Sequence, residues 1–224
     1  MLKKLEAALG YTYRDEKLVT NALSHTSYAN ERFQNSLYSY ERLEFLGDSI
    51  LGFVTANYLY TTFPEKHEGE LTRIRAELVC EQTLAKVARE IHLGDYLLLG
   101  HGEKQSGGSD RASILCDVME SLIAAAYLDS GFEAAKGIIT RLILPHLVDV
   151  INTRDYKTEL QEFIQRKRGQ SLAYELMSES GPDHCKEFFV RVLLNGIPIG
   201  EGSGTSKKRA EQAAAAKALA DLTE

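Results

Sequence analysis

Tryptophan is absent from this 224-residue sequence, and cysteine and proline are scarce, with three and four residues. Cys80, Cys116 and Cys185 lie far apart and form no Cys-x-x-Cys pair, which argues against a disulfide framework. The histidines contain no His-x-x-x-His pair, which argues against a zinc site. The scarcity of cysteine therefore favours reduced thiols and a cytoplasmic location.

Long hydrophobic runs are also missing, because charged residues interrupt every apolar stretch well before 18 residues. The first residues, Met1–Glu6, lack the apolar centre of a secretion signal. The composition, 44% hydrophobic and 26% charged, is typical of globular proteins. We therefore expect a globular protein without membrane partners.

The net charge of −6 is distributed unevenly. Residues 1–150 contain 15 Lys and Arg against 21 Asp and Glu, whereas residues 151–224 contain 11 of each. An acidic first part would repel a polyanion unless divalent cations intervened, while a neutral second part can bind one where its basic groups cluster.

Apolar periodicity predicts an all-helical first domain over residues 1–150. The Gly-rich stretch 100–110 is expected to be a loop, as is the polar stretch 30–36. The expected helices cover residues 2–9, 16–23, 40–62, 70–81, 83–91, 114–128 and 132–150.

The periodicity changes after residue 170. Residues 157–168 and 206–222 read as helices, and residues 173–179, 188–194 and 197–202 alternate as strands do. The order α-β-β-β-α predicts a small α+β domain over residues 155–224.

The helix expected at residues 40–62 has an unusual distribution of charge. Glu41, Glu44 and Asp48 share one face, yet they are embedded in an apolar run. Burying carboxylates is costly unless a cation or hydrogen bonds compensate. Gly47 and Gly52, each destabilising within a helix, are expected to let another backbone approach.

A second apolar helix repeats the pattern with Asp117 and Glu120, three residues apart. If the two helices pack together, Glu44, Asp48, Asp117 and Glu120 form a set of four oxygen donors. Such a set suits Mg²⁺ first and Mn²⁺ second. A di-iron bundle is disfavoured because the Glu-x-x-His pairs it requires are missing. Separate structural ion pairs are the remaining alternative.

The last predicted helix begins with Ser206, Lys207 and Lys208, which predicts a phosphate site at its amino end. The preceding Gly200, Gly202 and Gly204 are expected to let this loop come close to its ligand. Two further groups suit the minor groove of duplex RNA. They are the polar stripe Thr158, Gln161 and Gln165, and the stretch 181–184, which includes His184.

The stretch Glu41-Arg42-Leu43-Glu44-Phe45-Leu46-Gly47-Asp48 resembles the signature of the ribonuclease III family. Asp117-x-x-Glu120 followed by Leu128-Asp129-Ser130-Gly131 is similar to the second acidic motif of that family. Residues 157–214 resemble a double-stranded-RNA-binding domain. Residues 109–112, Ser-Asp-Arg-Ala, depart from the basic residues followed by Glu that are usual there.

The resemblance implies a role for each matching residue. Glu44, Asp117 and Glu120 would ligate Mg²⁺, and Asp48 and Glu120 would be the catalytic acids. Phe45 would enter the partner subunit of a homodimer. The RNA contacts would be Glu41, Glu68, Thr158, Gln161, Gln165, His184, Ser206, Lys207 and Lys208.

The activity implied is Mg²⁺-dependent, in-line hydrolysis of duplex RNA that leaves 5′-phosphates, 3′-hydroxyls and two-nucleotide 3′ overhangs. No nucleotide or organic cofactor is implied. Ribosomal RNA precursors and structured messages are the substrates expected from the family. The alternative is a catalytically silent double-stranded-RNA-binding protein, which would be expected to lose at least one of the four acids.

Overall fold

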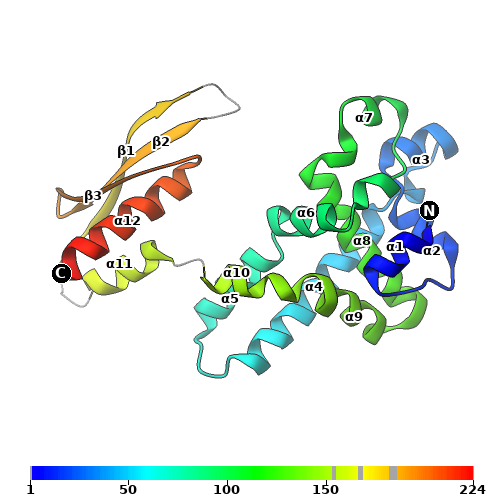
Figure 1. Ribbon diagram of the computed structural model, residues 1–224, viewed down its shortest axis with the longest axis horizontal. Coiled ribbons are helices and arrows are strands. Elements are labelled where there is room, and N and C mark those ends of the chain that lie inside the picture. Colours follow the sequence, from blue (N-terminus) through cyan, green and yellow to red (C-terminus); the bar gives the residue numbers. More distant parts are fainter. Residues whose placement is uncertain (1, 153–154, 166–168, 182–185, 224) are drawn as a thin grey trace. The chain divides into compact units, whose positions relative to one another are not determined.

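The computed structural model describes residues 2–152, 155–165, 169–181 and 186–223 (Figure 1). The chain divides into two compact units, Met1–Asn152 and Thr153–Glu224. The predicted domain limits, 1–150 and 155–224, stay a prediction. No helix in the described part of the chain is both long enough and apolar enough to cross a membrane.

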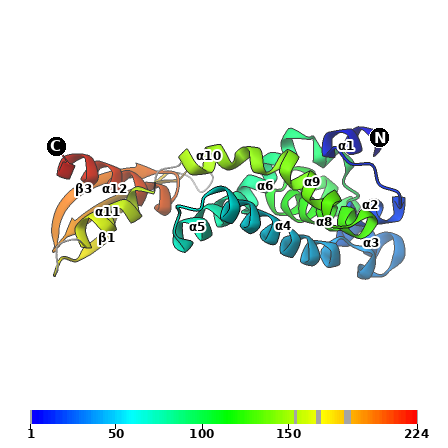
Figure 2. The same cartoon turned by 90° about the horizontal axis from the view of Figure 1, so that it is seen from below.

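The first unit is helical, and α8 is its central element. Val118, Met119, Leu122 and Ile123 of α8 are fully buried, and α2, α4, α6 and α9 pack against this helix (Figure 2). The helices are α1 (Leu2–Leu9), α2 (Glu16–Ala22), α3 (Thr26–Phe33), α4 (Glu41–Thr62), α5 (Glu68–Leu78), α6 (Glu81–Glu90), α7 (His101–Gln105), α8 (Ala112–Ser130), α9 (Phe132–Leu142) and α10 (Leu147–Asn152).

The helices α4 and α8 approach closely at one glycine. A side chain at Gly47 would overlap the backbone carbonyl oxygen of Glu120, so only glycine fits there. The expectation of close approach is therefore confirmed for Gly47. It is wrong for Gly52, because a Cβ at that position would meet nothing within 4 Å.

Three segments of the first unit differ from the sequence expectations: residues 30–33, residues 132–150 and the Gly-rich stretch 100–110. Residues 30–33 belong to helix α3, which begins after His25, whose ring nitrogen Nδ1 caps the backbone N–H of Ser27. The expected helix over residues 132–150 is interrupted by a 3₁₀ turn at Leu144–His146, which contains Pro145. Proline lacks the backbone N–H that an uninterrupted helix needs.

The Gly-rich segment is partly helical rather than a plain loop, with α7 followed by a 3₁₀ turn at Gly108–Asp110. Its side chains form ion pairs that hold this shape. Arg111 lies 2.6 Å from Glu103, and Asp110 lies 2.7 Å from Arg89. Two of the residues that depart from the family pattern, Asp110 and Arg111, therefore take part in ion pairs.

Asp129, near the end of α8, binds the segment between α1 and α2. Its carboxylate accepts hydrogen bonds from the Tyr11 hydroxyl and from the backbone N–H groups of Arg14 and Asp15. Nearby, the Tyr13 hydroxyl donates to the backbone carbonyl of Leu122 at 2.9 Å. These bonds fix the start of the chain against the central helix.

The second unit has the predicted order of one helix, three strands and a final helix (Figure 1). The strands pair antiparallel in the order β1-β2-β3, with an irregularity at Met177 of β1. Their bounds are β1 (Leu172–Ser180), β2 (Glu187–Leu194) and β3 (Ile197–Gly204), and the helices are α11 (Tyr156–Gln165) and α12 (Lys207–Thr223).

The helix α12 contributes small residues to the core of the second unit, which also contains Leu160, Ile164, Val190 and Val192. Ala210, Ala214 and Ala218 of α12 are fully buried against the sheet. Side chains at Gly200, Gly202 and Gly204 of β3 would overlap atoms of α12, so glycine there allows the strand and helix to pack closely. These glycines, expected to serve a ligand-binding loop, lie within a strand, where they serve helix packing.

Candidate active site

Helices α4 and α8 bring together the four carboxylates that the sequence singles out. Glu44 and Asp48 are one turn apart on α4, and Asp117 and Glu120 are one turn apart on α8. The close approach at Gly47 sets the two pairs against each other, because Gly47 directly precedes Asp48 and faces the backbone of Glu120. The packing of two apolar helices thus creates an acidic site.

Glu120 is the most buried of these carboxylates, with 9% of its surface exposed. Burial, together with the negative charges of Asp48, Glu44 and Asp117, raises the pKa of Glu120 to about 8. Burial and the charges of Asp117, Glu41 and Asp48 likewise raise the pKa of Glu44. Each shift has the same cause, which is negative charge concentrated in a partly desolvated site.

Asp117 has neighbours that the sequence did not indicate. Burial and the charge of Glu81, at the start of α6, raise the pKa of Asp117, whereas a hydrogen bond from Tyr40 lowers it. The Tyr40 hydroxyl lies 3.2 Å from Oδ2 of Asp117. Glu81 and Tyr40 are far from Asp117 in sequence, so helical periodicity could not relate them to it.

No Lys, Arg or His among the described residues forms an ion pair with any of the four carboxylates. As the side chains lie, no three His, Cys, Asp or Glu residues in the described ranges are close enough to hold one metal ion. The donor set nevertheless fits a hard divalent cation, because it consists of carboxylate oxygens that no cationic side chain in the described ranges neutralises by an ion pair. Binding would require the carboxylates to rotate toward one another.

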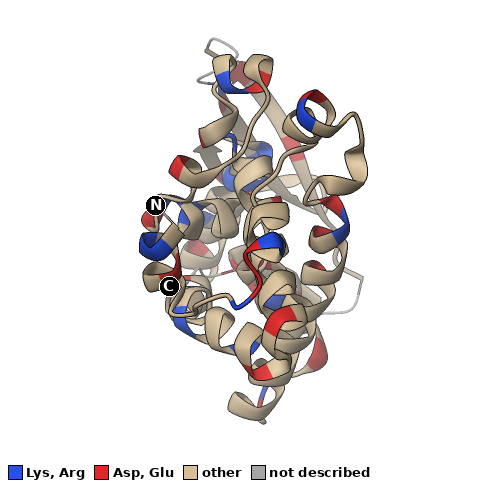
Figure 3. Ribbon diagram, turned by 90° about the vertical axis from the view of Figure 1, so that its right-hand side faces the viewer, with Lys and Arg blue, Asp and Glu red and all other residues tan. Residues whose placement is uncertain are grey.

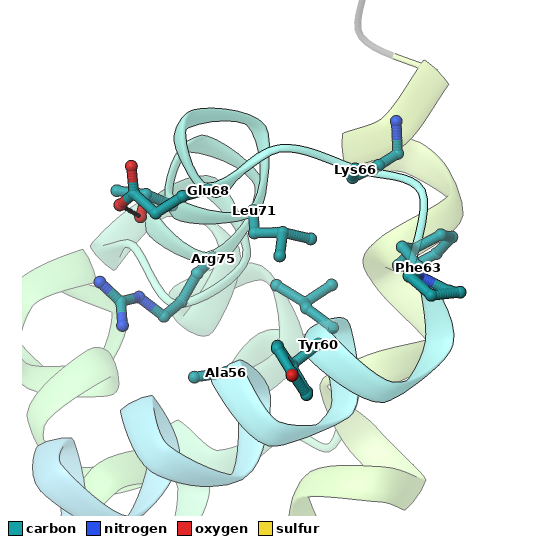
Figure 4. Close-up of a pocket in the computed structure, with 10 residues that line it drawn as sticks. Ala56, Tyr60, Phe63, Lys66, Glu68, Leu71 and Arg75 are labelled. Carbon is teal, nitrogen blue, oxygen red and sulfur yellow. Dashed lines mark hydrogen bonds between the residues drawn. The ribbon is translucent and has the colours of Figure 1, made fainter.

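The two outlying acids of the prediction have different surroundings. Glu41 is exposed and accepts a 2.8 Å hydrogen bond from the Thr26 hydroxyl, and its charge acts on Glu44. Glu68 starts α5 and lines a separate cavity of about 620 Å³ between α4 and α5, together with Tyr60 and Arg75 (Figure 4). Among the described residues that line this cavity, none is one of the four carboxylates of the acidic site.

Phe45 follows Glu44 on α4 and is 79% exposed. Phe53, further along the helix, is 62% exposed and makes an edge-on contact with Phe132 of α9 at 5.9 Å between ring centroids. Aromatic rings exposed to this extent are typical of surfaces that bind a partner. The ring of Phe45 thus lies on the surface immediately beside the acidic site.

In the second unit, three consecutive basic residues, Lys207, Lys208 and Arg209, lie at the amino end of α12. Ser206 precedes the helix, and its hydroxyl oxygen accepts a hydrogen bond from the backbone N–H of Arg209 at 3.3 Å. Lys207 and Lys208 are exposed and form no ion pair with any residue in the described part of the chain. Figure 3 shows the distribution of acidic and basic residues over the ribbon. Free cations at a helix amino end can bind phosphate.

The polar stripe on α11 is exposed, as a surface for a ligand must be. Thr158, Gln161 and Gln165 are all exposed, and the Thr158 hydroxyl donates to Asp155 at 2.9 Å. His184 lies outside the described residues.

Comparison with known proteins relates both units to characterised families. A family model described as Ribonuclease-III-like matches residues 15–147, and one described as Double-stranded RNA binding motif matches residues 156–222. Ribonuclease 3 of Pelotomaculum thermopropionicum is 49% identical over 97% of this chain and 92% of its own length. Ribonuclease 3 of Caldanaerobacter subterraneus is 48% identical over 99% of this chain and 98% of its own length.

A solved structure, the nuclease domain of ribonuclease III from Campylobacter jejuni, covers 65% of this chain and 97% of its own chain. Its TM-score is 0.60, with 41% sequence identity. Three observations indicate the same family: the two acidic helices, the α-β-β-β-α unit, and the relatives that match nearly the full length of the chain. The chain belongs to the ribonuclease III family of double-stranded-RNA endoribonucleases.

Proposed function

We propose that this protein cleaves duplex RNA at the acidic site between α4 and α8, with Mg²⁺ as its cofactor and Mn²⁺ as a substitute. The observation that supports this proposal is the set of four carboxylates that form no ion pair with any described Lys, Arg or His, one of them with its pKa raised to about 8. Glu44, Asp117 and Glu120 would hold the cation. When bound, the cation supplies charge neutralisation and a more acidic water.

The chain contributes the positions of the acids. Asp48 and Glu120 are the proposed catalytic acids, which orient the attacking water and accept its proton. The packing of α4 against α8 at Gly47 fixes the distance between the two helices that carry these acids. Hydrolysis in line at phosphorus leaves a 5′-phosphate and a 3′-hydroxyl.

RNA binding is assigned to both units. Residues 155–224 form the proposed double-stranded-RNA-binding domain, and residues 1–150 the endonuclease domain. In the double-stranded-RNA-binding domain, Lys207 and Lys208 provide phosphate contacts that carry most of the affinity. The other proposed RNA contacts are Glu41, Glu68, Thr158, Gln161, Gln165, His184 and Ser206.

A homodimer is part of the proposal. The Campylobacter jejuni structure is described as showing structural flexibility in the region involved in dimer formation of its nuclease domain. In this chain, Phe45 is exposed beside the acidic site, where it would be buried by a partner subunit. Two sites in one dimer would cut both strands and leave two-nucleotide 3′ overhangs. A cytoplasmic enzyme of this kind would process ribosomal RNA precursors and structured messages.

A catalytically silent double-stranded-RNA-binding protein is the disfavoured alternative, because all four acids are present and the relatives are named as ribonucleases. The deciding experiment compares wild type with Glu120→Ala on a long RNA duplex in Mg²⁺. We expect Glu120→Ala to bind the duplex normally on a gel and to lose cleavage. Glu133→Ala, which removes an exposed acid on α9, should cleave normally. Wild type that shifts the duplex without cutting it would contradict the proposal.

A further inference from the structure

Tyr40, the residue before α4, is buried to 4% exposure but directs its hydroxyl at a carboxylate of the site. The hydroxyl lies 3.2 Å from Oδ2 of Asp117, a residue 77 positions away on α8. A buried phenol ring holds its hydroxyl oxygen at a defined position, and the hydroxyl can donate one hydrogen bond. Oδ1 of Asp117 has no such donor from Tyr40 and is left for another partner.

The backbone of Tyr40 is held by the segment before α3. Its N–H donates to the carbonyl of Ser24 at 2.9 Å. Ser24 in turn forms a parallel bridge with Leu98, whose carbonyl accepts from the N–H of His25 at 2.9 Å. Tyr40 is therefore anchored to two other segments of the unit before its side chain reaches Asp117.

The ring of Tyr40 is fixed as well. The His25 ring lies 5.8 Å from it, centroid to centroid, and is itself held by the 3.1 Å hydrogen bond from the Ser27 backbone to Nδ1. A phenol has an ordinary pKa of about 10, so the Tyr40 hydroxyl is protonated at neutral pH and able to donate. This arrangement has the features of a rigid hydrogen-bond donor to a carboxylate.

We propose that Tyr40 is a positioning residue, which orients the carboxylate of Asp117 so that its second oxygen can bind the catalytic cation. The inference rests on the proposed metal site. Groups that hydrogen-bond to metal ligands fix the orientation of those ligands, and their removal typically weakens metal binding about 10–100-fold. Tyr40 therefore acts through Asp117 and need not contact the RNA.

The test uses Tyr40→Phe in the full-length protein, with Tyr13→Phe as the matched control. Tyr13 is equally buried, at 5% exposure, and its hydroxyl donates one 2.9 Å hydrogen bond to a backbone carbonyl instead of a carboxylate. The first readout is Mn²⁺ affinity in the absence of RNA, followed by electron paramagnetic resonance. Thermal unfolding reports any general structural loss.

We expect Tyr40→Phe to raise the Kd for Mn²⁺ about tenfold and Tyr13→Phe to leave it within about twofold of wild type. The Mg²⁺ concentration for half-maximal cleavage should rise in parallel, with duplex affinity unchanged. Equal Mn²⁺ affinity of Tyr40→Phe and wild type would overturn the inference alone, as would an equal loss in Tyr13→Phe. A wild type that binds no Mn²⁺ would overturn the proposed metal site together with the inference.

Should Tyr40→Phe fail to fold, the wild type itself provides the measurement. In protein labelled with ¹³C at the tyrosine ζ carbons, Mg²⁺ should shift the Tyr40 resonance and leave that of Tyr13 in place. The absence of a Tyr40 shift at saturating Mg²⁺ would overturn the inference.

Discussion

Gly47 of α4 lies against the backbone carbonyl of Glu120 on α8, so closely that a methyl group at Gly47 would overlap it. Gly47→Ala must therefore separate the two helices that carry the acidic site. We expect a loss of about 1–3 kcal/mol in the free energy of unfolding, because overpacking forces backbone shifts. Cleavage should fall with it.

Gly52→Ala is the control on the same helix, since a Cβ there meets nothing within 4 Å. It should stabilise the protein by about 0.5–1 kcal/mol through helix propensity. Chemical denaturation measures both variants. If Gly47→Ala left the free energy of unfolding unchanged, the contact with Glu120 would not fix the spacing of the two helices.

The raised pKa of Glu120 predicts a pH-dependent stability in metal-free protein. In the unfolded chain its pKa returns to about 4.3, so the cost of its buried charge is absent at pH 4 and complete above pH 8. In EDTA, Glu120→Gln should raise Tm at pH 8.5 by roughly 3–6 °C, which corresponds to about 1–2 kcal/mol, and should leave it unchanged near pH 4.

Glu133→Gln serves as the control, because Glu133 is an exposed residue paired with Lys136. Its Tm should follow that of wild type at every pH. A lower Tm of Glu120→Gln at pH 8.5 would mean that the ionised carboxylate is stabilised in the folded protein.

Asp129→Asn tests the attachment of the segment between α1 and α2. Burial raises the pKa of Asp129, but hydrogen bonds from Arg14, Tyr11 and Asp15 outweigh it and leave the pKa below its usual range. The carboxylate thus stabilises the fold above the unfolded pKa of about 3.9, and this contribution disappears as the pH falls through the lowered value. We expect a loss of about 1 kcal/mol at pH 7, discounted for solvent screening. Thermal unfolding at pH 7 and at pH 2.5 measures the difference in Tm between the variant and wild type at both limits of this pH range. An unchanged Tm at pH 7 would show that Asp129 does not stabilise the segment between α1 and α2.

Lys207→Ala combined with Lys208→Ala tests the phosphate contacts of α12. Duplex affinity should fall for all sequences, and the slope of log K against log salt should decrease by about two. Lys217→Ala removes a cation from the far end of the same helix, where it pairs with Asp221 at 3.3 Å, and should leave the slope unchanged. Equal slopes for the double variant and wild type, measured by fluorescence anisotropy, would place the contacts elsewhere.

Phe45→Ala tests the homodimer. Removing an exposed ring costs the monomer little, whereas loss of a buried interface anchor weakens association by about 2 kcal/mol or more. Multi-angle light scattering should show more monomer than wild type at equal concentration. Tyr60→Ala, which removes another ring from α4, at 74% exposure, should not change the mass. A Phe45→Ala protein as dimeric as wild type would contradict this role.

The main elements, and the acidic pairs carried by α4 and α8, could be predicted from sequence because they depend on local patterns. That the two pairs meet depends on the packing of the helices at Gly47. The apolar period of α4, and its end at Thr62 before Pro64, are local signals. Gly-rich composition concealed α7, because helical periodicity does not reveal the ion pairs of this segment, between Glu103 and Arg111 and between Asp110 and Arg89. Tyr40 was missed for the same reason, since its hydrogen bond to Asp117 joins residues 77 positions apart.

The glycines of β3 affect where the basic residues that contact RNA are placed. Because Gly200, Gly202 and Gly204 accept the surface of α12 without intervening side chains, the helix is seated on the strand at one register. A Cβ at Gly202 would overlap the backbone nitrogen of Ala214, so the strand cannot carry a side chain at this contact. The glycines of β3 therefore fix the position of α12 on the strand. They thereby also fix the position of Lys207 and Lys208 relative to the sheet.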